Sequence, residues 1–255
     1  MPSASFARLC MAAALLGAAA QARADDADAA YAAYVAGAYG DAVDLAKHDG
    51  SAASFALAAR SLNAVAYFET EKKTARRRAD QAIDMAELAT ALDPDLPEAH
   101  LQAAIGMALK GARLSPFRAF FSGLAGKARE RIDAALSLDP ENPWALSTSA
   151  AWRIEVARRG GASLYGADPV KGHEEFMAAR ALAPENIAIA YECALRLLAD
   201  GRAEWRADAL AALETALAGA PETQFERDVQ SLARNFKTAI ANGRDAEAAF
   251  IAAQP

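Results

Sequence analysis

Apolar and polar residues recur along the chain with the three-to-four-residue period of amphipathic helices, and no segment shows the two-residue alternation of a half-buried strand. Clusters of Gly and Pro interrupt the period where helices are expected to end, and 160–167 reads as a glycine-containing loop. The expected helices cover 26–37, 40–48, 51–70, 72–91, 97–110, 117–138, 143–159, 168–182, 186–199, 203–218, 222–241 and 243–252. The pattern therefore predicts an all-α fold.

The stretch LSLDPENPWAL, residues 136–146, shows how one helix ends and the next begins. Leu138 is the last apolar residue of one helical pattern. Pro140 keeps Asp139, the residue before it, out of the α-helical range of backbone angles, so the helix must end there. Asn142 is placed to cap the next helix, with Pro143 at the first helical position, where the N–H that proline lacks would have no partner anyway. The stretch predicts two helices joined by a very short turn.

The same turn chemistry recurs at Pro94, Pro140 and Pro184, which are 46 and 44 residues apart. Each proline follows a segment of the type A..A..L.P, and a period of this size is typical of helical solenoids. These segments resemble the second helix of a tetratricopeptide repeat, and AGAYGDAVDLA, residues 36–46, resembles its Gly-x-Tyr-x-x-Ala turn. Leu96 stands where the other two turns have Asn142 and Asn186 as caps. The resemblance implies a superhelical solenoid of antiparallel helix pairs over 25–255.

The middle of the chain carries a second resemblance. The segments EAHLQAAIGMALKG, GKARERIDAALSLDPENPWAL and SLYGADPVKGHEEFMAARALAPEN, within 88–199, are similar to regulator-of-microtubule-dynamics proteins and to T components of bacterial TRAP transporters. What this resemblance implies is a tetratricopeptide-like helical scaffold that binds a protein or a ligand on its concave face, without a fixed chemistry of its own.

The first 24 residues differ from the rest. A single arginine precedes an apolar run too short to span a bilayer, and the segment ends in Ala22-Arg23-Ala24 before an abrupt acidic stretch. This order is typical of a cleaved secretory signal, and the alternative is an N-terminal helix of the mature fold. Cys10 lacks the small preceding residues of a lipoprotein cysteine. The expectation is a soluble periplasmic or secreted protein without an integral membrane segment after cleavage.

Charge and cysteine content narrow the functions further. The chain has 27 basic and 33 acidic residues, and cleavage would remove only basic ones, Arg8 and Arg23. An acidic protein of this kind is not expected to bind nucleic acid. Cys193 would be the one cysteine left, on an apolar helical face, where core packing is expected rather than reactivity.

No catalytic motif is complete. GASLYGAD, residues 161–168, has the glycine spacing of a phosphate loop without its lysine, and it also lacks the last glycine of a nucleophile elbow. HEEFM, residues 173–177, ends in Met177 where a zinc protease has its second histidine. His48, His100 and His173 have neither ligand nor triad spacing. The sequence predicts no cofactor, no metal and no enzymatic activity.

Two features remain as binding candidates. The first is the basic run 71–80, which could meet an anionic partner or be a solvated helix face. The second is the segment 152–168, in which the extra residues of a longer than standard repeat lie. Insertions of this kind in solenoids often lie on the binding face, and Trp, Tyr and Arg contribute most to contact energy there. The candidate binding residues there are Trp152, Arg153, Arg158, Arg159 and Tyr165. In the alternative interpretation, Trp144 and Trp152 fill the core and the arginines are solvated.

The sequence therefore favours a periplasmic or secreted scaffold that binds another protein. The alternatives are an accessory component of a transport system that binds a small ligand, and a helical enzyme.

Overall fold

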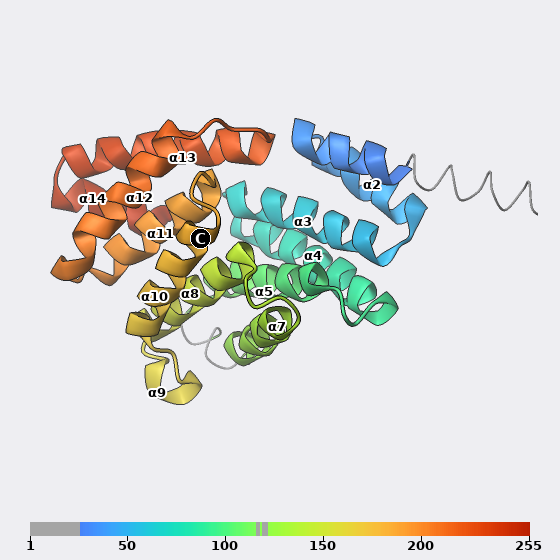
Figure 1. The fold of residues 1–255 in the computed structure, drawn as a ribbon, viewed down its shortest axis with the longest axis horizontal. Coiled ribbons are helices and arrows are strands. Elements are labelled where there is room, and N and C mark those ends of the chain that lie inside the picture. Colours follow the sequence, from blue (N-terminus) through green and yellow to red (C-terminus); the bar gives the residue numbers. More distant parts are fainter. Residues whose placement is uncertain (1–25, 116–117, 119–121) are drawn as a thin grey trace, which may run out of the picture.

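The computed structural model describes residues 26–115, 118 and 122–255, and within them it is helical with no strand (Figure 1). Residues 26–36 are helical. The elements that follow are α2 (Tyr39–Asp49), α3 (Ala52–Phe68), α4 (Lys72–Leu92), α5 (Pro97–Ala112), α7 (Leu124–Leu138), α8 (Pro143–Arg158), α9 (Ala162–Tyr165), α10 (Pro169–Leu182), α11 (Ile187–Asp200), η1 (Ala203–Trp205), α12 (Arg206–Ala218), α13 (Gln224–Ala241) and α14 (Arg244–Ala253). The all-α prediction is confirmed, and the expected signal segment 1–24 lies outside the described residues.

Three expected boundaries were wrong. The helix expected over 117–138 is not continuous: α7 begins at Leu124, because Gly123 before it has φ +67°, in the left-handed region that interrupts a right-handed helix, and the expected start at 117 lies outside the described residues. The expected loop 160–167 contains the single-turn helix α9, which Gly166 ends at φ +64°. The helix expected over 203–218 is divided into the 3-10 turn η1 and α12.

The turns between helices have the predicted chemistry. The side chain of Asn142 accepts hydrogen bonds from the backbone N–H groups of Trp144 (3.1 Å) and Ala145 (3.0 Å), and Pro143 is the first residue of α8. Asn186 caps α11 in the same manner. Leu96 makes no side-chain cap at the start of α5. The capping asparagines are thus confirmed at two of the three repeated turns.

The helices form two rows. The inner row consists of α3, α5, α8 and α11, each in contact with the next. The outer row consists of α4, α7, α10 and α12, and each of these bridges two inner helices or, for α12, the pair α11 and α13. Small residues at these contacts let the helices approach closely, as in the fully buried series Ala75, Ala79, Ala82, Ala86 and Ala89 along α4.

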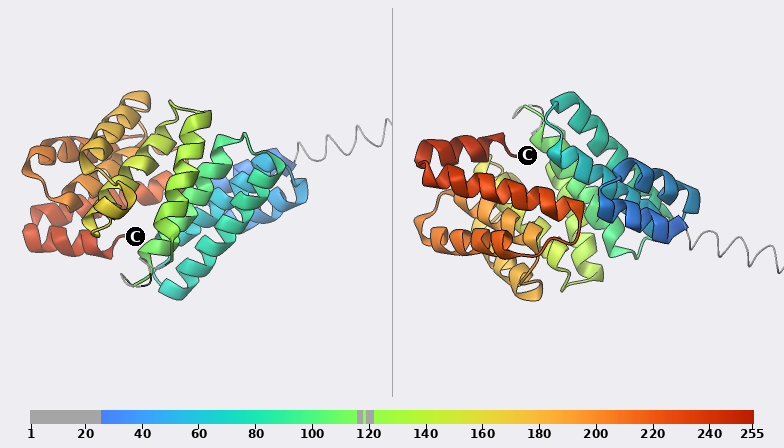
Figure 2. Two further views of the ribbon diagram at one scale, coloured as in Figure 1. Left: turned by 90° about the horizontal axis from the view of Figure 1, so that it is seen from below. Right: turned by 90° about the horizontal axis from the view of Figure 1, so that it is seen from above.

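Helix α13 returns to the beginning of the inner row (Figure 2). The ring of Phe225, in its first turn, lies 6.0 Å from the ring of Tyr67 and 5.6 Å from that of Phe68, both near the end of α3. At Gly37 a Cβ would stand 2.6 Å from Cγ of Gln224, and its φ of +82° also favours glycine. These contacts join the last third of the chain to the first.

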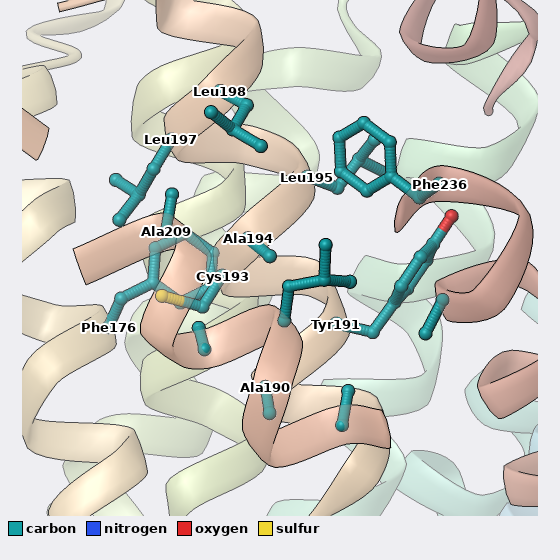
Figure 3. Packing of buried hydrophobic residues seen from close by; sticks show 14 of the residues in the cluster. Phe176, Ala190, Tyr191, Cys193, Ala194, Leu195, Leu197, Leu198, Ala209 and Phe236 are labelled. Atoms are coloured by element: carbon teal, nitrogen blue, oxygen red, sulfur yellow. The ribbon is translucent and has the colours of Figure 1, made fainter. Parts of the chain in front are cut away.

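The largest continuous core surrounds α11 (Figure 3). Tyr191 and Phe236 meet edge to face at 6.5 Å, and Cys193 lies beside Phe176 and Ala209. Burial raises the pKa of the Cys193 thiol to about 12, so the thiolate is disfavoured. The expectation that Cys193 packs in the core is confirmed.

Candidate binding site

A cavity of about 260 Å³ lies among α7, α13 and the helices of the inner row. Its walls come from α3, α5, α7, α8, α11 and α13, together with Pro255. Alanines form much of the wall that α5, α7 and α8 contribute. Six of them line the cavity: Ala104, Ala108, Ala112, Ala125, Ala128 and Ala151.

The rest of the wall is mainly apolar and aromatic. Met107 and Leu109 come from α5, Trp144 and Val156 from α8, and Phe225 from α13. Small-molecule sites in proteins have this composition, in which a largely apolar wall holds a few placed polar groups.

One end of the cavity is polar. Glu192 accepts a hydrogen bond of 2.6 Å from the hydroxyl of Tyr67 and one of 3.0 Å from Nε of Arg196. Arg196 also donates to the backbone oxygen of Pro255 at 2.9 Å. Glu155 lies 3.8 Å from Arg196 and also accepts from Arg159. This network joins α3, α8 and α11 at the cavity wall.

The network keeps its charges. Burial alone would raise the pKa of Glu155, but Arg158, Arg196 and Arg159 together lower it below the ordinary 4.5. For Arg196, burial acts to lower the pKa, and the carboxylates of Glu192 and Glu155 outweigh it. Burial and the neighbouring Glu192 raise the pKa of Tyr67, so its hydroxyl remains a donor.

A smaller chamber of about 70 Å³ adjoins the cavity. The two spaces share five lining residues: Tyr67, Ile105, Leu109, Trp144 and Phe225. The chamber differs in its polar groups, which are Tyr34, Arg60, Asn63, Glu98 and Gln102.

The five sequence-predicted binding residues do not form one surface. Trp152 is buried, donates from Nε1 to the carbonyl of Ala125 at 2.9 Å, and lines the cavity together with Arg159. Arg153 forms an ion pair with Glu175 of α10 at 3.0 Å, outside the cavity. Arg158 pairs with Glu155, and Tyr165 of α9 packs against the cluster that contains Trp152.

The sequence analysis did not identify the polar residues that line the two spaces, although several of them stand out as charged residues within apolar helices. Arg60 is the only charged residue of the apolar segment 52–68, and Glu192 and Arg196 stand four residues apart in the otherwise apolar start of α11. A lone charge, or an i,i+4 pair, within a helix that is apolar on all sides indicates a buried polar site.

The incomplete catalytic motifs have structural roles. His173 bonds to Asp208 at 2.8 Å and stacks on Trp205, and His100 bonds to the carbonyl of Pro94. Over the described part of the chain, no three His, Cys, Asp or Glu side chains gather in a way that could hold a metal ion. None of the described helices combines the length and apolarity that a bilayer span requires.

No protein-family model matches the chain, and no curated protein matches it. The geometry and chemistry of the two spaces are therefore the basis for a functional assignment.

Proposed function

We propose that the protein is a binding protein that holds a small, largely apolar ligand in the 260 Å³ cavity. The observation that carries the proposal is the cavity wall, which is built of alanines, aliphatic side chains and tryptophans from six helices. The proposal includes the tetratricopeptide-like pairing of the helices and a periplasmic or secreted location, both inferred from the sequence.

The closure of the inner face favours a small ligand over a protein segment. An inner row without α13 would present an open groove suited to a peptide or helix. Here Phe225 packs on Tyr67 and Phe68, and Pro255 lies against the polar end of the cavity. A ligand in this space would lie between α5, α8 and α11 with Phe225 of α13 beside it.

The apolar wall provides sufficient affinity. Removing about 200 Å² of ligand surface from water contributes about 5 kcal/mol at about 25 cal/mol per Å². A gain of about 5 kcal/mol corresponds to a dissociation constant of about 0.2 mM, and the lost translational and rotational freedom offsets part of it, so dissociation constants in the millimolar range are expected from this area alone.

The test uses a neutral hydrophobic fluorophore, N-phenylnaphthylamine, and two matched substitutions. Ala108→Phe fills the cavity from α5 at a position whose side chain is exposed toward it. Ala178→Phe adds the same ring to an exposed position of α10 outside the cavity. The fluorophore should bind the unmodified protein and Ala178→Phe equally, and Ala108→Phe at least about tenfold more weakly. Absence of binding, or equal binding by all three proteins, would contradict the proposal.

A second candidate function is the protein-binding scaffold expected from the sequence. One observation favours it: the last residues of three outer helices, Leu92, Leu138 and Leu182, are 58%, 39% and 46% exposed at equivalent positions of the repeated turn. A partner isolated from envelope extract should lose affinity when these three leucines are changed to serine, and should tolerate Ala108→Phe. The opposite pattern would place the partner at the cavity instead.

A further inference from the structure

The small chamber contains a largely buried cation without an ion-pair partner. Arg60 forms no salt bridge with any described residue. Its guanidinium lies over the ring of Tyr34 at 4.9 Å and within 5.8 Å of the ring of Trp144. A buried guanidinium is costly unless an anion or several acceptors satisfy it.

Neighbouring groups keep Arg60 ionised. Burial acts to lower the pKa of Arg60, while Tyr34 and Glu98 raise it by a larger amount in total. Glu98 lines the chamber too, and Gln102 donates to its Oε1 at 2.9 Å. The chamber thus presents one cation and one anion that do not contact each other.

Asn63 and Gln102 hold Glu98 in the chamber wall. Asn63 is only 4% exposed, and its Nδ2 donates at 2.9 Å to both the backbone and the side-chain oxygens of Gln102, which in turn donates to Glu98. The Oδ1 of Asn63 has no hydrogen-bond partner among the described residues, but it lies beside Gly106, where an added Cβ would stand 3.2 Å from it, and Gly106 does not line the chamber.

Arg60 and Glu98 together suit a ligand that has a carboxylate for Arg60 and a cationic donor for Glu98. We propose that the small chamber binds the carboxylate and ammonium groups of a free α-amino acid, whose apolar side chain extends into the large cavity. This inference rests on the proposed function and names the class of its ligand.

The dimensions agree with this division. A space of about 70 Å³ has room for roughly five water molecules, which suits two small charged groups but not a large side chain as well. The apolar side chain would pass Tyr67, Trp144 and Phe225, which line both spaces. Aromatic walls beside a charged head group also favour the ammonium ion.

Compounds that carry one charge complement the chamber less well. A simple carboxylic acid would meet Arg60 but would bring its negative charge close to Glu98. A simple amine would meet Glu98 and be repelled by Arg60. A zwitterion satisfies both residues, because each buried charge gains an opposite charge.

The experiment is isothermal titration calorimetry on the full chain with three probes of equal branching: L-leucine, 4-methylpentanoate and 3-methylbutylamine. The second lacks the ammonium group and the third lacks the carboxylate. L-Leucine should bind, and each of the other two should bind at least about tenfold more weakly. Equal binding of L-leucine and 4-methylpentanoate would overturn the inference without using any variant.

Substitutions then assign the groups. Arg60→Gln and Glu98→Gln should each weaken L-leucine binding by at least about tenfold, and Arg77→Gln, on the exposed face of α4, should leave it unchanged. Circular dichroism on the same samples checks folding, and N-phenylnaphthylamine checks the large cavity. If the fluorophore binds and L-leucine does not, this inference is wrong and the proposed function stands. If neither binds, both are wrong.

Discussion

The region around α11 and the region from α2 to α5 are both helical, yet their interiors differ. Around α11, large side chains such as Tyr191, Leu195 and Phe236 belong to one continuous cluster. From α2 to α5 the interior is divided into small clusters that consist mostly of alanine, among them Ala56, Ala89 and Ala99. The first region buries a core, whereas the second brings helical backbones close together.

The difference explains where the cavity lies. Alanine shortens the distance between two helices that pack directly, but it leaves space when a third helix holds them apart. The cavity wall combines alanines of α5 and α8, such as Ala104, Ala108 and Ala151, with large residues of α11 and α13, such as Tyr191 and Phe225. The cavity therefore lies at the junction of the two kinds of packing.

The largest expected effect is in the core around α11. Phe236→Ala should lower the free energy of unfolding by about 3–5 kcal/mol, because it removes a fully buried ring and leaves an empty space in the core. Phe55→Ala, at the edge of a small alanine cluster, should cost about half as much, since Phe55 is only partly buried. Urea denaturation measures both, and equal losses would show that the two interiors do not differ in strength.

The next largest effect is expected from adding side-chain volume in the region from α2 to α5. Ala82 is fully buried on α4, so Ala82→Leu should destabilise the protein by about 1–3 kcal/mol. Ala108→Leu adds the same atoms where the cavity has room and should cost less than about 0.5 kcal/mol. Thermal unfolding compares the two, and an equal loss at both positions would mean that the cavity does not accept added volume.

A smaller effect should appear in acid at the polar network that joins the two regions. Glu155 has a lowered pKa in the folded protein, so its stabilising contribution is complete above the ordinary value of 4.5 and is lost as the pH falls through the lower folded value. The free energy of unfolding of Glu155→Gln should consequently depend less on pH below 4.5. Parallel urea titrations at several pH values measure this, and curves of identical slope would contradict the assignment.

The smallest effect is expected at Arg158. Its side chain is 42% exposed and pairs with Glu155 one helical turn away, so Arg158→Ala should change stability by less than about 0.5 kcal/mol. Binding of a protein partner to the sequence-predicted residues would still be weakened by this substitution. If a partner recovered from extract binds Arg158→Ala with unchanged affinity, Arg158 does not belong to the binding surface.

The sequence allowed the helices and their turns to be predicted because these are local. Asn142 and Pro143 act on residues within one helical turn, and the spacing of three prolines is visible without a structure. The single turn α9 was missed because four residues are too few to repeat the helical pattern. The candidate site was harder, because Arg60, Glu98 and Trp144 come from three helices and only tertiary packing brings them together. Trp152 was chosen by residue type and does line the cavity, while its indole N–H is bonded to Ala125 and its ring belongs to a buried cluster.

The contact between Tyr67 and Glu192 spans 125 residues, and Phe225 closes on the same tyrosine from still farther along the chain. Most other contacts between helices join elements that are close in the sequence. Such contacts form quickly, because little chain entropy is lost in bringing the two helices together. We therefore expect the successive helix pairs to fold early and the long-range contacts at Tyr67 to form last. Both ligand spaces are lined by Tyr67 and Phe225, so they would be completed only in the final step of folding. A ligand present at that stage would slow reopening of the structure, and its effect would be seen in the unfolding rate.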